Sequence, residues 1–280
     1  MKDLNLKDKI AVVTGGAGIL CSEMVRRLAA NGVKTAIIDY KENRAMELAA
    51  TIGRETGTRS IGICANVLDQ KSLVAAREEI HRVLGSIDIL INGAGGNSPE
   101  ATTAVEFMSG KEDEDLSETF FGLKIEGFDR VFELNFKGTL LPTMVFASDM
   151  TGKKSGAIVN ISSMNSFRPL TKIPAYSAAK ASVNNFTQWL AVHFAPAGVR
   201  VNAIAPGFII TDQNRFLLTD EKSGKLTARG NKVIANTPMG RFATPDEMSG
   251  TVLFLISDWA KFITGIVIPV DGGFSAYSGV

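Results

Sequence analysis

Short apolar runs alternate with longer amphipathic stretches along this chain, and the alternation restricts the fold more than any other feature. Continuously apolar strands separated by helices are typical of a parallel sheet that is covered on both faces. Right-handed crossovers between such strands give a single doubly wound α/β sheet of the Rossmann type. We expect strands at residues 10–14, 35–39, 60–64, 87–92, 156–162, 199–204 and 266–270. We expect helices at residues 22–31, 43–56, 71–84, 128–150, 175–194 and 245–257.

The composition is that of an ordinary globular protein. Of the 280 residues, 45% are hydrophobic and 21% are charged, and the net charge is +1. No repeat or flexible linker divides the sequence, so residues 1–280 are predicted to form one domain. The balanced charge argues against a nucleic-acid partner. Cys21, Cys64, His81 and His193 are too few for a disulfide framework or a metal site.

The sequence carries no recognisable membrane or secretion signal. Its first nine residues are polar and alternate in charge, unlike a signal peptide. No apolar run reaches the roughly 18 residues that a membrane span requires. We therefore expect a cytoplasmic protein without a membrane partner.

Two polar segments interrupt the alternation. Residues 98–127 include the acidic run 111–115, and residues 208–238 follow the predicted sixth strand. Loops of this length in a compact domain are usually functional or disordered. Both follow the carboxyl ends of strands, where open α/β sheets bind ligands, so 208–238 is expected to be a substrate loop and 98–127 an insertion beside the site. The acidic run itself is expected to be a solvated surface.

Three residues have the spacing of a proton-transfer site. Tyr176 follows Ser163 by thirteen residues, and Lys180 follows Tyr176 by four. A helix places positions i and i+4 on one face, so Tyr176 and Lys180 would project together. A nearby ammonium would lower the pKa of the phenol, and Ser163 could hydrogen-bond the oxygen that gains or loses charge. By itself Tyr-x-x-x-Lys is common, so the assignment depends on the cofactor signals that precede it.

A glycine-rich turn and a carboxylate indicate a dinucleotide site. Residues 14–21 follow the first predicted strand and open the first helix, where backbone N–H groups can hold a pyrophosphate. Asp39 ends the second strand, where it can bind both adenosine-ribose hydroxyls and would repel a 2′-phosphate. Asp39 could also cap the next helix. The pattern predicts NAD (NADH) over NADP, although Lys41 and Arg44 lie close enough in sequence to leave NADP open.

With these residues, the chain resembles the short-chain dehydrogenase/reductase family over nearly its full length. The matching motifs occur in order: residues 14–21, 92–95, Asn135, the Ser163–Tyr176–Lys180 set and 206–207. The resemblance implies that Tyr176 is the general acid–base and that Lys180 lowers its pKa and binds the nicotinamide ribose. It implies that Ser163 holds the substrate oxygen and that Asn135 positions a proton-relaying water.

The resemblance also implies a set of cofactor-binding residues. Asn66 stands where the family often has an aspartate that touches adenine, and it keeps the amide without the charge. The set is Gly15, Gly18, Ile19, Leu20, Asp39, Asn66, Val67, Asn92, Gly93, Ala94, Tyr176, Lys180, Pro206, Gly207, Ile209 and Thr211.

The glycine loop departs from the family pattern. The family has Gly-x-x-x-Gly-x-Gly, and counting from Gly15 places Ile19 and Cys21 at the second and third glycines. Their Cβ atoms should displace the cofactor or the helix slightly, unless Gly16 and Gly18 compensate. We expect Cys21 to be a small buried residue rather than a reactive thiol.

The substrate expectation comes from a closer similarity at residues 165–176, 211–218, 222–230 and 271–280. These resemble the D-mannonate oxidoreductase (fructuronate reductase) branch of the family, which implies an enzyme that interconverts the alcohol and ketone of a sugar acid. Candidate substrate-binding residues are Asn165, Arg168, Gln213, Asn214 and Arg215, with Lys172 as a further cation.

Other readings remain open. Another sugar or sugar-acid dehydrogenase, such as a gluconate 5-dehydrogenase, would have the same catalytic residues. A dinucleotide-binding protein without catalysis is a more distant alternative. Analogy with the family also implies a homotetramer, with residues 128–150 and 175–194 at one interface.

Overall fold

The core of the protein is one seven-stranded parallel sheet with the order β3-β2-β1-β4-β5-β6-β7. The computed structural model describes residues 4–211, 215–220 and 223–279. The strands run as β1 Ile10–Thr14, β2 Lys34–Asp39, β3 Ser60–Cys64, β4 Ile89–Asn92, β5 Gly156–Ile161, β6 Val199–Pro206 and β7 Val267–Val270. Every predicted strand is present within two residues of its expected ends, and the Rossmann-type prediction is confirmed.

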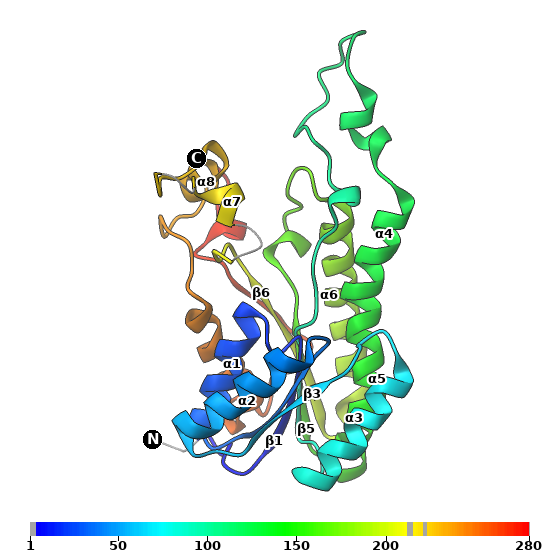
Figure 1. Cartoon of the computed structure of the whole chain (residues 1–280), viewed down its shortest axis with the longest axis vertical. Helices are drawn as coiled ribbons and strands as arrows, with labels where there is room; N and C mark the ends of the chain where they lie inside the picture. The colour runs from blue at the N-terminus through cyan, green and yellow to red at the C-terminus, as the bar shows by residue number, and fades with distance from the viewer. Residues whose placement is uncertain (1–3, 212–214, 221–222, 280) are drawn as a thin grey trace.

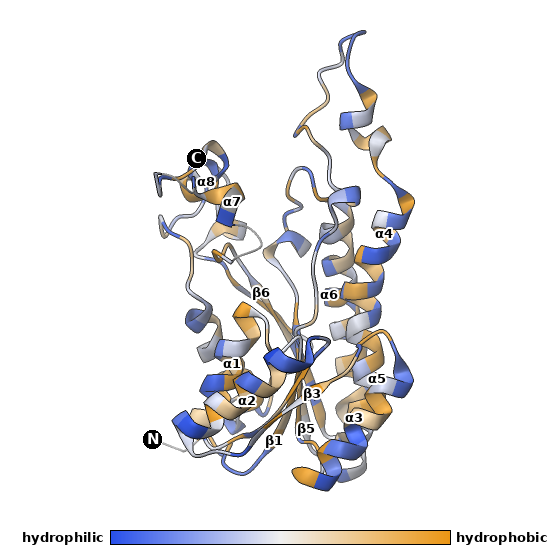
Figure 2. Cartoon of the chain, in the orientation of Figure 1, coloured by the Kyte–Doolittle hydropathy of each residue, from blue (hydrophilic) through white to orange (hydrophobic). Residues whose placement is uncertain are grey.

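Helices cover both faces of this sheet (Figure 1). On one face lie α1 (Ile19–Ala30), α2 (Glu42–Thr56) and α9 (Ser249–Ile256), and on the other lie α3 (Gln70–Val83), α5 (Gly138–Lys153) and α6 (Pro174–Phe194). Successive strand residues point to opposite faces, so Ala11 and Val13 join the first core while Ile10 and Val12 join the second. Burial on both faces is why the strands are apolar throughout. Figure 2 shows hydrophobic residues along the strands and on the helix surfaces that face them.

The long helix predicted at 128–150 is divided into three parts. It begins as α4 (Ile125–Phe132), continues through a π-helical turn at Glu133–Lys137, and resumes as α5, which contains Pro142. A π-helical turn widens the helix locally and re-aims its side chains, and such turns are frequent at functional sites. This turn carries Asn135, which is fully buried. The periodicity of the sequence did not reveal the break, because apolar residues recur at helical spacing on both sides of it.

The two polar interruptions have different structures. Residues 98–127 contain three short 3-10 turns and project from the body of the protein (Figure 1). Their acidic run, 111–115, is mainly exposed, which agrees with the expected solvated surface. The segment 208–238 contains α7 (Arg215–Leu218) and α8 (Ala228–Ala235), which were not predicted. The Thr227 hydroxyl begins α8 by accepting from the Gly230 N–H at 3.0 Å.

In the part of the chain that the structure describes, no helix is both long and apolar enough to cross a membrane.

Candidate active site

The residues predicted to be functional gather at one edge of the sheet. They lie at or just beyond the carboxyl ends of five strands, as Gly15 (β1), Asp39 (β2), Asn92 (β4), Ser163 (β5) and Pro206 (β6). In a parallel sheet these ends share one edge, where diverging loops leave room for a ligand. The fold therefore brings together residues that are far apart in sequence.

Ser163, Tyr176 and Lys180 meet at the end of β5. Ser163 caps a short 3-10 turn, and its side chain lies close enough to the Tyr176 phenol to affect the pKa of that group. Tyr176 and Lys180 lie one turn apart on α6, with the Lys180 Nζ 5.7 Å from the centre of the Tyr176 ring. The Lys180 Nζ also donates to the Ile161 carbonyl at 2.8 Å. This bond joins the second turn of α6 to Ile161, the last residue of β5.

Burial governs the acid–base properties of these groups. Removing the Tyr176 phenol from water raises its pKa, and the interaction with the Ser163 side chain acts in the opposite direction. We expected the positive charge of Lys180 to lower the pKa of the Tyr176 phenol. That expectation is wrong for the protein as described, because burial outweighs the other contributions and the pKa is raised. Burial also lowers the pKa of Lys180 itself to about 8, so its charged form is held less firmly than that of an exposed lysine.

Asn135 lies beside these three residues. Its Nδ2 donates to the Gly96 carbonyl at 2.7 Å and to the Val131 carbonyl at 2.8 Å, and its Oδ1 accepts from the Gly96 N–H at 3.2 Å. A Cβ added at Gly95 would lie 2.8 Å from the Asn135 Oδ1 and 3.1 Å from the Lys180 Nζ. The four predicted catalytic residues therefore form one cluster. The hydrogen bonds of Asn135 hold the loop after β4, and its predicted contact with a water stays a prediction.

A buried chain of polar side chains connects β4, β5 and α6. The Asn92 Nδ2 donates to the Asn160 Oδ1 at 2.9 Å, and the Asn160 Nδ2 donates to the Thr187 hydroxyl at 2.9 Å. Asn92 and Asn160 are direct partners in the β4–β5 register. Sequence reasoning missed Asn160 and Thr187, although a polar residue inside an apolar run was a usable signal. Asn92 thus links β4 to β5, in addition to its predicted contact with the cofactor.

The glycine loop has the form of a cradle for an anion. Gly15 has a φ of +59°, and a Cβ there would lie 2.9 Å from the Ala94 Cα. Gly18 precedes α1 without a capping side chain, and the first turn of α1, which includes Ile19 and Leu20, has no acidic residue. No carboxylate within that turn therefore opposes its backbone N–H groups or the positive end of the helix dipole. The loop fits a dinucleotide pyrophosphate.

Asp39 connects this loop to β2. Its carboxylate accepts from the Ala17 N–H at 3.3 Å and from the Lys41 N–H at 3.1 Å. The N-cap position of α2 is occupied by Lys41. Asp39 is therefore not the cap of this helix, a role that the sequence had left open. Arg44 donates to the Ala17 carbonyl at 3.1 Å, which places a cation beside the same loop.

The unusual Cys21 is accommodated by a residue outside the glycine loop. A Cβ added at Gly93 would lie 2.2 Å from the Cys21 Sγ and 2.8 Å from the Thr14 carbonyl oxygen. Gly93 therefore supplies the space that the side chain of Cys21 occupies, and the compensation expected from Gly16 and Gly18 lies at Gly93 instead. Cys21 is 3% exposed, and burial raises its pKa to about 12, as expected for a packed and unreactive thiol.

The remaining predicted cofactor residues follow the ends of other strands. Asn66 closes its own turn, since its Oδ1 accepts from the Leu68 N–H at 2.9 Å. Val67 is buried, and so is Ile209. A Cβ at Gly207 would lie 2.6 Å from the Asp271 Cα, which fixes the turn after Pro206 against the segment that follows β7. Thr211 is half-buried at the end of the described part of this segment.

The candidate substrate residues do not all converge. Asn165 is buried just after Ser163, whereas Arg168 is exposed and its Nε donates to the Ser275 carbonyl at 3.2 Å. Arg215 begins α7 and is exposed. Gln213 and Asn214 lie outside the described residues.

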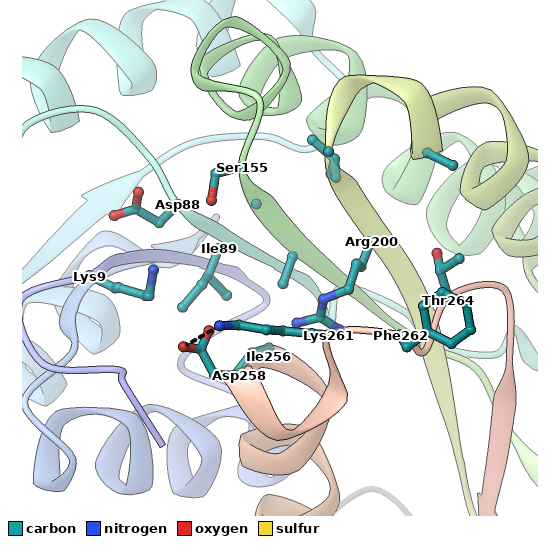
Figure 3. Close-up of a pocket in the computed structure, with 15 residues that line it drawn as sticks. Lys9, Asp88, Ile89, Ser155, Arg200, Ile256, Asp258, Lys261, Phe262 and Thr264 are labelled. Atoms are coloured by element: carbon teal, nitrogen blue, oxygen red, sulfur yellow. Dashed lines mark ion pairs between the residues drawn. The ribbon is translucent and has the colours of Figure 1, made fainter. Parts of the chain in front are cut away.

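A cavity of about 490 Å³ lies at the opposite edge of the sheet, near the amino ends of the strands (Figure 3). Most of its charged groups have partners. Asp258 and Lys261 form an ion pair of 2.9 Å, and the Arg200 guanidinium donates to backbone carbonyls such as that of Ile263. The functional cluster therefore lies at the other edge, away from this cavity.

Comparisons with known proteins agree with this geometry. The family described as enoyl-(acyl carrier protein) reductase matches residues 17–275. The uncharacterized oxidoreductase UxuB of Bacillus subtilis is 49% identical over 277 residues, which cover 99% of this chain and 98% of that protein. An uncharacterized oxidoreductase of Haemophilus influenzae is 50% identical over 277 residues, 99% of this chain and 96% of that protein. A crystal structure from the same organism, provisionally named a D-mannonate oxidoreductase and containing bound NAD, has a TM-score of 0.93 and 50% identity, and covers 99% of this chain and 98% of that one.

The depressed pKa of Lys180 predicts a pH-dependent stability. Below about pH 8 both the folded and the unfolded protein carry the charge, so the folded state bears the full cost of burying it. Between that pH and 10.5 the unfolded chain binds more protons, so wild-type stability rises with pH. We expect Lys180→Met to lose about 3 kcal/mol relative to wild type between about pH 7 and pH 11, as urea unfolding would measure. A stability difference that is independent of pH, like that expected for the exposed Lys71→Met, would contradict this.

Proposed function

Because the chain belongs to the short-chain dehydrogenase/reductase family, of which the matching enoyl reductase family is a part, we propose that it reversibly reduces D-fructuronate to D-mannonate with NADH. The observation that carries the reaction type is the joined cluster of Ser163, Tyr176 and Lys180 beside the dinucleotide cradle. The substrate is proposed from the provisional name of the 50% identical structure.

The proposed roles follow from the contacts of each side chain. NADH supplies the hydride to the ketone carbon. Tyr176 gives its phenolic proton to the ketone oxygen as that oxygen gains negative charge, so one hydride and one proton make the alcohol. The Ser163 hydroxyl donates a hydrogen bond to the same oxygen. The Lys180 Nζ lies 5.7 Å from the centre of the Tyr176 ring, and its positive charge would favour the phenolate that remains, against the opposing effect of burial.

NAD is proposed over NADP because of Asp39. Its carboxylate ends β2 beside the glycine loop, where it can accept hydrogen bonds from both ribose hydroxyls and would repel a 2′-phosphate. The solved structure with 50% identity contains NAD, which supports the same choice. Lys41 and Arg44 lie nearby and could bind the 2′-phosphate of NADP if the Asp39 carboxylate were removed.

We further propose that the protein is a cytoplasmic homotetramer. The location follows from the proposed use of NADH, which is regenerated in the cytoplasm. The assembly is supported by the exposed apolar side chains on α4, α5 and α6, which include Phe132, Met144, Trp189 and Val192. Trp189 and Val192 are 59% and 78% exposed, an unfavourable state for large apolar side chains unless a neighbouring subunit covers them.

The reaction is tested by the absorbance of the nicotinamide band with D-fructuronate as substrate. We expect rapid loss of NADH, and we expect Tyr176→Phe to lower kcat about 100-fold or more because the proton donor is gone. Tyr40→Phe removes the hydroxyl of an exposed tyrosine and should leave kcat unchanged. An unaltered rate in Tyr176→Phe would refute the proton-transfer role, and turnover of 5-keto-gluconate without turnover of fructuronate would refute the substrate.

Cofactor choice is tested by Asp39→Ser. Without the carboxylate, a 2′-phosphate would meet Lys41 and Arg44, so the KM for NADPH should fall about tenfold while the KM for NADH rises. Steady-state kinetics with both cofactors measure the change. Glu42→Gln removes a neighbouring carboxylate, that of the first residue of α2, and it should leave the preference as in wild type. An equal shift in the two variants would mean that general charge, and not Asp39, decides the preference.

The assembly is tested by Val192→Glu, which puts a charge in place of one of these exposed apolar side chains. Light scattering should give the mass of a tetramer for wild type and a smaller mass for the variant. Val74→Glu on α3 makes the same change at another exposed site and should keep the wild-type mass. A monomeric wild type would overturn the proposal.

A further inference from the structure

Three segments above the carboxyl edge of the sheet meet at Glu106. They follow the adjacent strands β4, β5 and β6, and they contribute Glu106, Lys172 and Lys232 respectively. The Lys232 Nζ, from α8, donates to the Glu106 Oε2 at 2.5 Å and lies 5.9 Å from the centre of the Phe107 ring. The Lys172 Nζ donates to the Ala104 carbonyl at 2.6 Å. The insertion 98–127 and α8, both in the upper part of Figure 1, are thus linked across the edge where the catalytic cluster lies.

We call the place where Glu106, Lys172 and Lys232 come together the junction. Backbone contacts fix Lys172 there. Its carbonyl accepts from the Thr103 N–H at 2.9 Å, and its φ of +75° is a left-handed value that costs a residue with a Cβ about 1–2 kcal/mol. Lys172 precedes Tyr176 by four residues, and Ala101, two residues before Thr103, packs in the apolar cluster that Tyr176 joins. The junction therefore stands close to the proposed acid–base residue along both segments.

The charge at the junction is unbalanced. The hydrogen bond from Lys232 lowers the pKa of Glu106, and the positive charges of Lys232, Arg229 and Lys172 act in the same direction. Three cations therefore lie near Glu106, and Lys232 is in contact with it. Arg229 lies one turn before Lys232 on α8 and is half-buried. An excess of positive charge above the carboxyl edge of the sheet favours an anionic ligand.

We propose that Lys172, Arg229 and Lys232 bind the carboxylate of the substrate, and that Glu106 competes with the substrate for them. This inference rests on the proposed function and names the part of the site that recognises the acid group. A carboxylate would meet cations from two segments at once, the segment after β5 and α8, so its binding would also hold α8 over the catalytic cluster. Arg168, one of the first candidates from the sequence, is instead directed to the Ser275 carbonyl.

Lys232 and Glu106 carry opposite charges, so removing each charge should change the KM for fructuronate in opposite directions. D-fructose has a CH2OH group where D-fructuronate has its carboxylate, so the pair isolates the charge. Lys232→Met should raise the KM for fructuronate about tenfold, the loss expected for one hydrogen bond to a charged group. Glu106→Gln should lower the same KM about two- to fivefold, because the internal competitor is neutralised. The inhibition constant of fructose against fructuronate should be unchanged in both variants.

Lys225→Met is the matched control, because it removes an exposed lysine from the same segment, outside the junction. It should keep the wild-type KM. If the ion pair only fastens α8 to the insertion, Glu106→Gln and Lys232→Met will change the constants for fructuronate and fructose in the same direction and by similar factors, and the proposal is overturned. Turnover by wild type separates the two questions: a wild type that ignores every sugar acid refutes the proposed function, whereas a wild type that uses fructuronate with indifferent variants refutes only the carboxylate site.

Discussion

The hydrogen bond from the buried ammonium of Lys180 to the Ile161 carbonyl is the contact on which the rest of the site depends. Burying an amine has a free-energy cost, which is visible in a pKa lowered to about 8. In exchange, α6 is fastened to the end of β5, and Tyr176 remains one turn away beside Ser163. Ser163 follows the same strand, so the hydroxyl, the phenol and the ammonium keep a fixed arrangement as long as this one bond persists.

A second set of buried polar contacts keeps the sheet in register beneath the site. Asn92 and Asn160 pair across β4 and β5, and Asn160 continues to Thr187 on α6. A shift of either strand by one residue would leave buried amides without partners, a penalty of about 1–3 kcal/mol for each group. The polar residues inside these apolar elements therefore specify one alignment, which the hydrophobic contacts around them would not enforce by themselves.

The cofactor edge illustrates how a departure from a family pattern is absorbed. Cys21 places a thiol where the family has a glycine, and the required space comes from Gly93, at the end of another strand. The two residues are coupled by a contact between α1 and the loop after β4, so neither is understood from its own motif. At Glu106, too, the contacts come from residues distant in sequence, since the segments that follow three different strands meet there.

The sequence by itself determined the strands and most of the helices, because these depend on local periodicity, and it placed Tyr176 and Lys180 within one helix. The catalytic roles of the cluster were expected from the resemblance to the family. Tyr176 and Lys180 had to share a face once α6 formed. Only the tertiary structure decided the π-helical turn at Asn135, the helix α8, the partner of Cys21, the direction of Arg168 and the raised pKa of Tyr176. These features arise from contacts between segments distant in sequence or from the depth at which a group is buried, and neither leaves a periodic signal in the chain. Burial in particular reversed the expected effect on the phenol, since desolvation depends on everything packed around a group and not on one neighbouring charge.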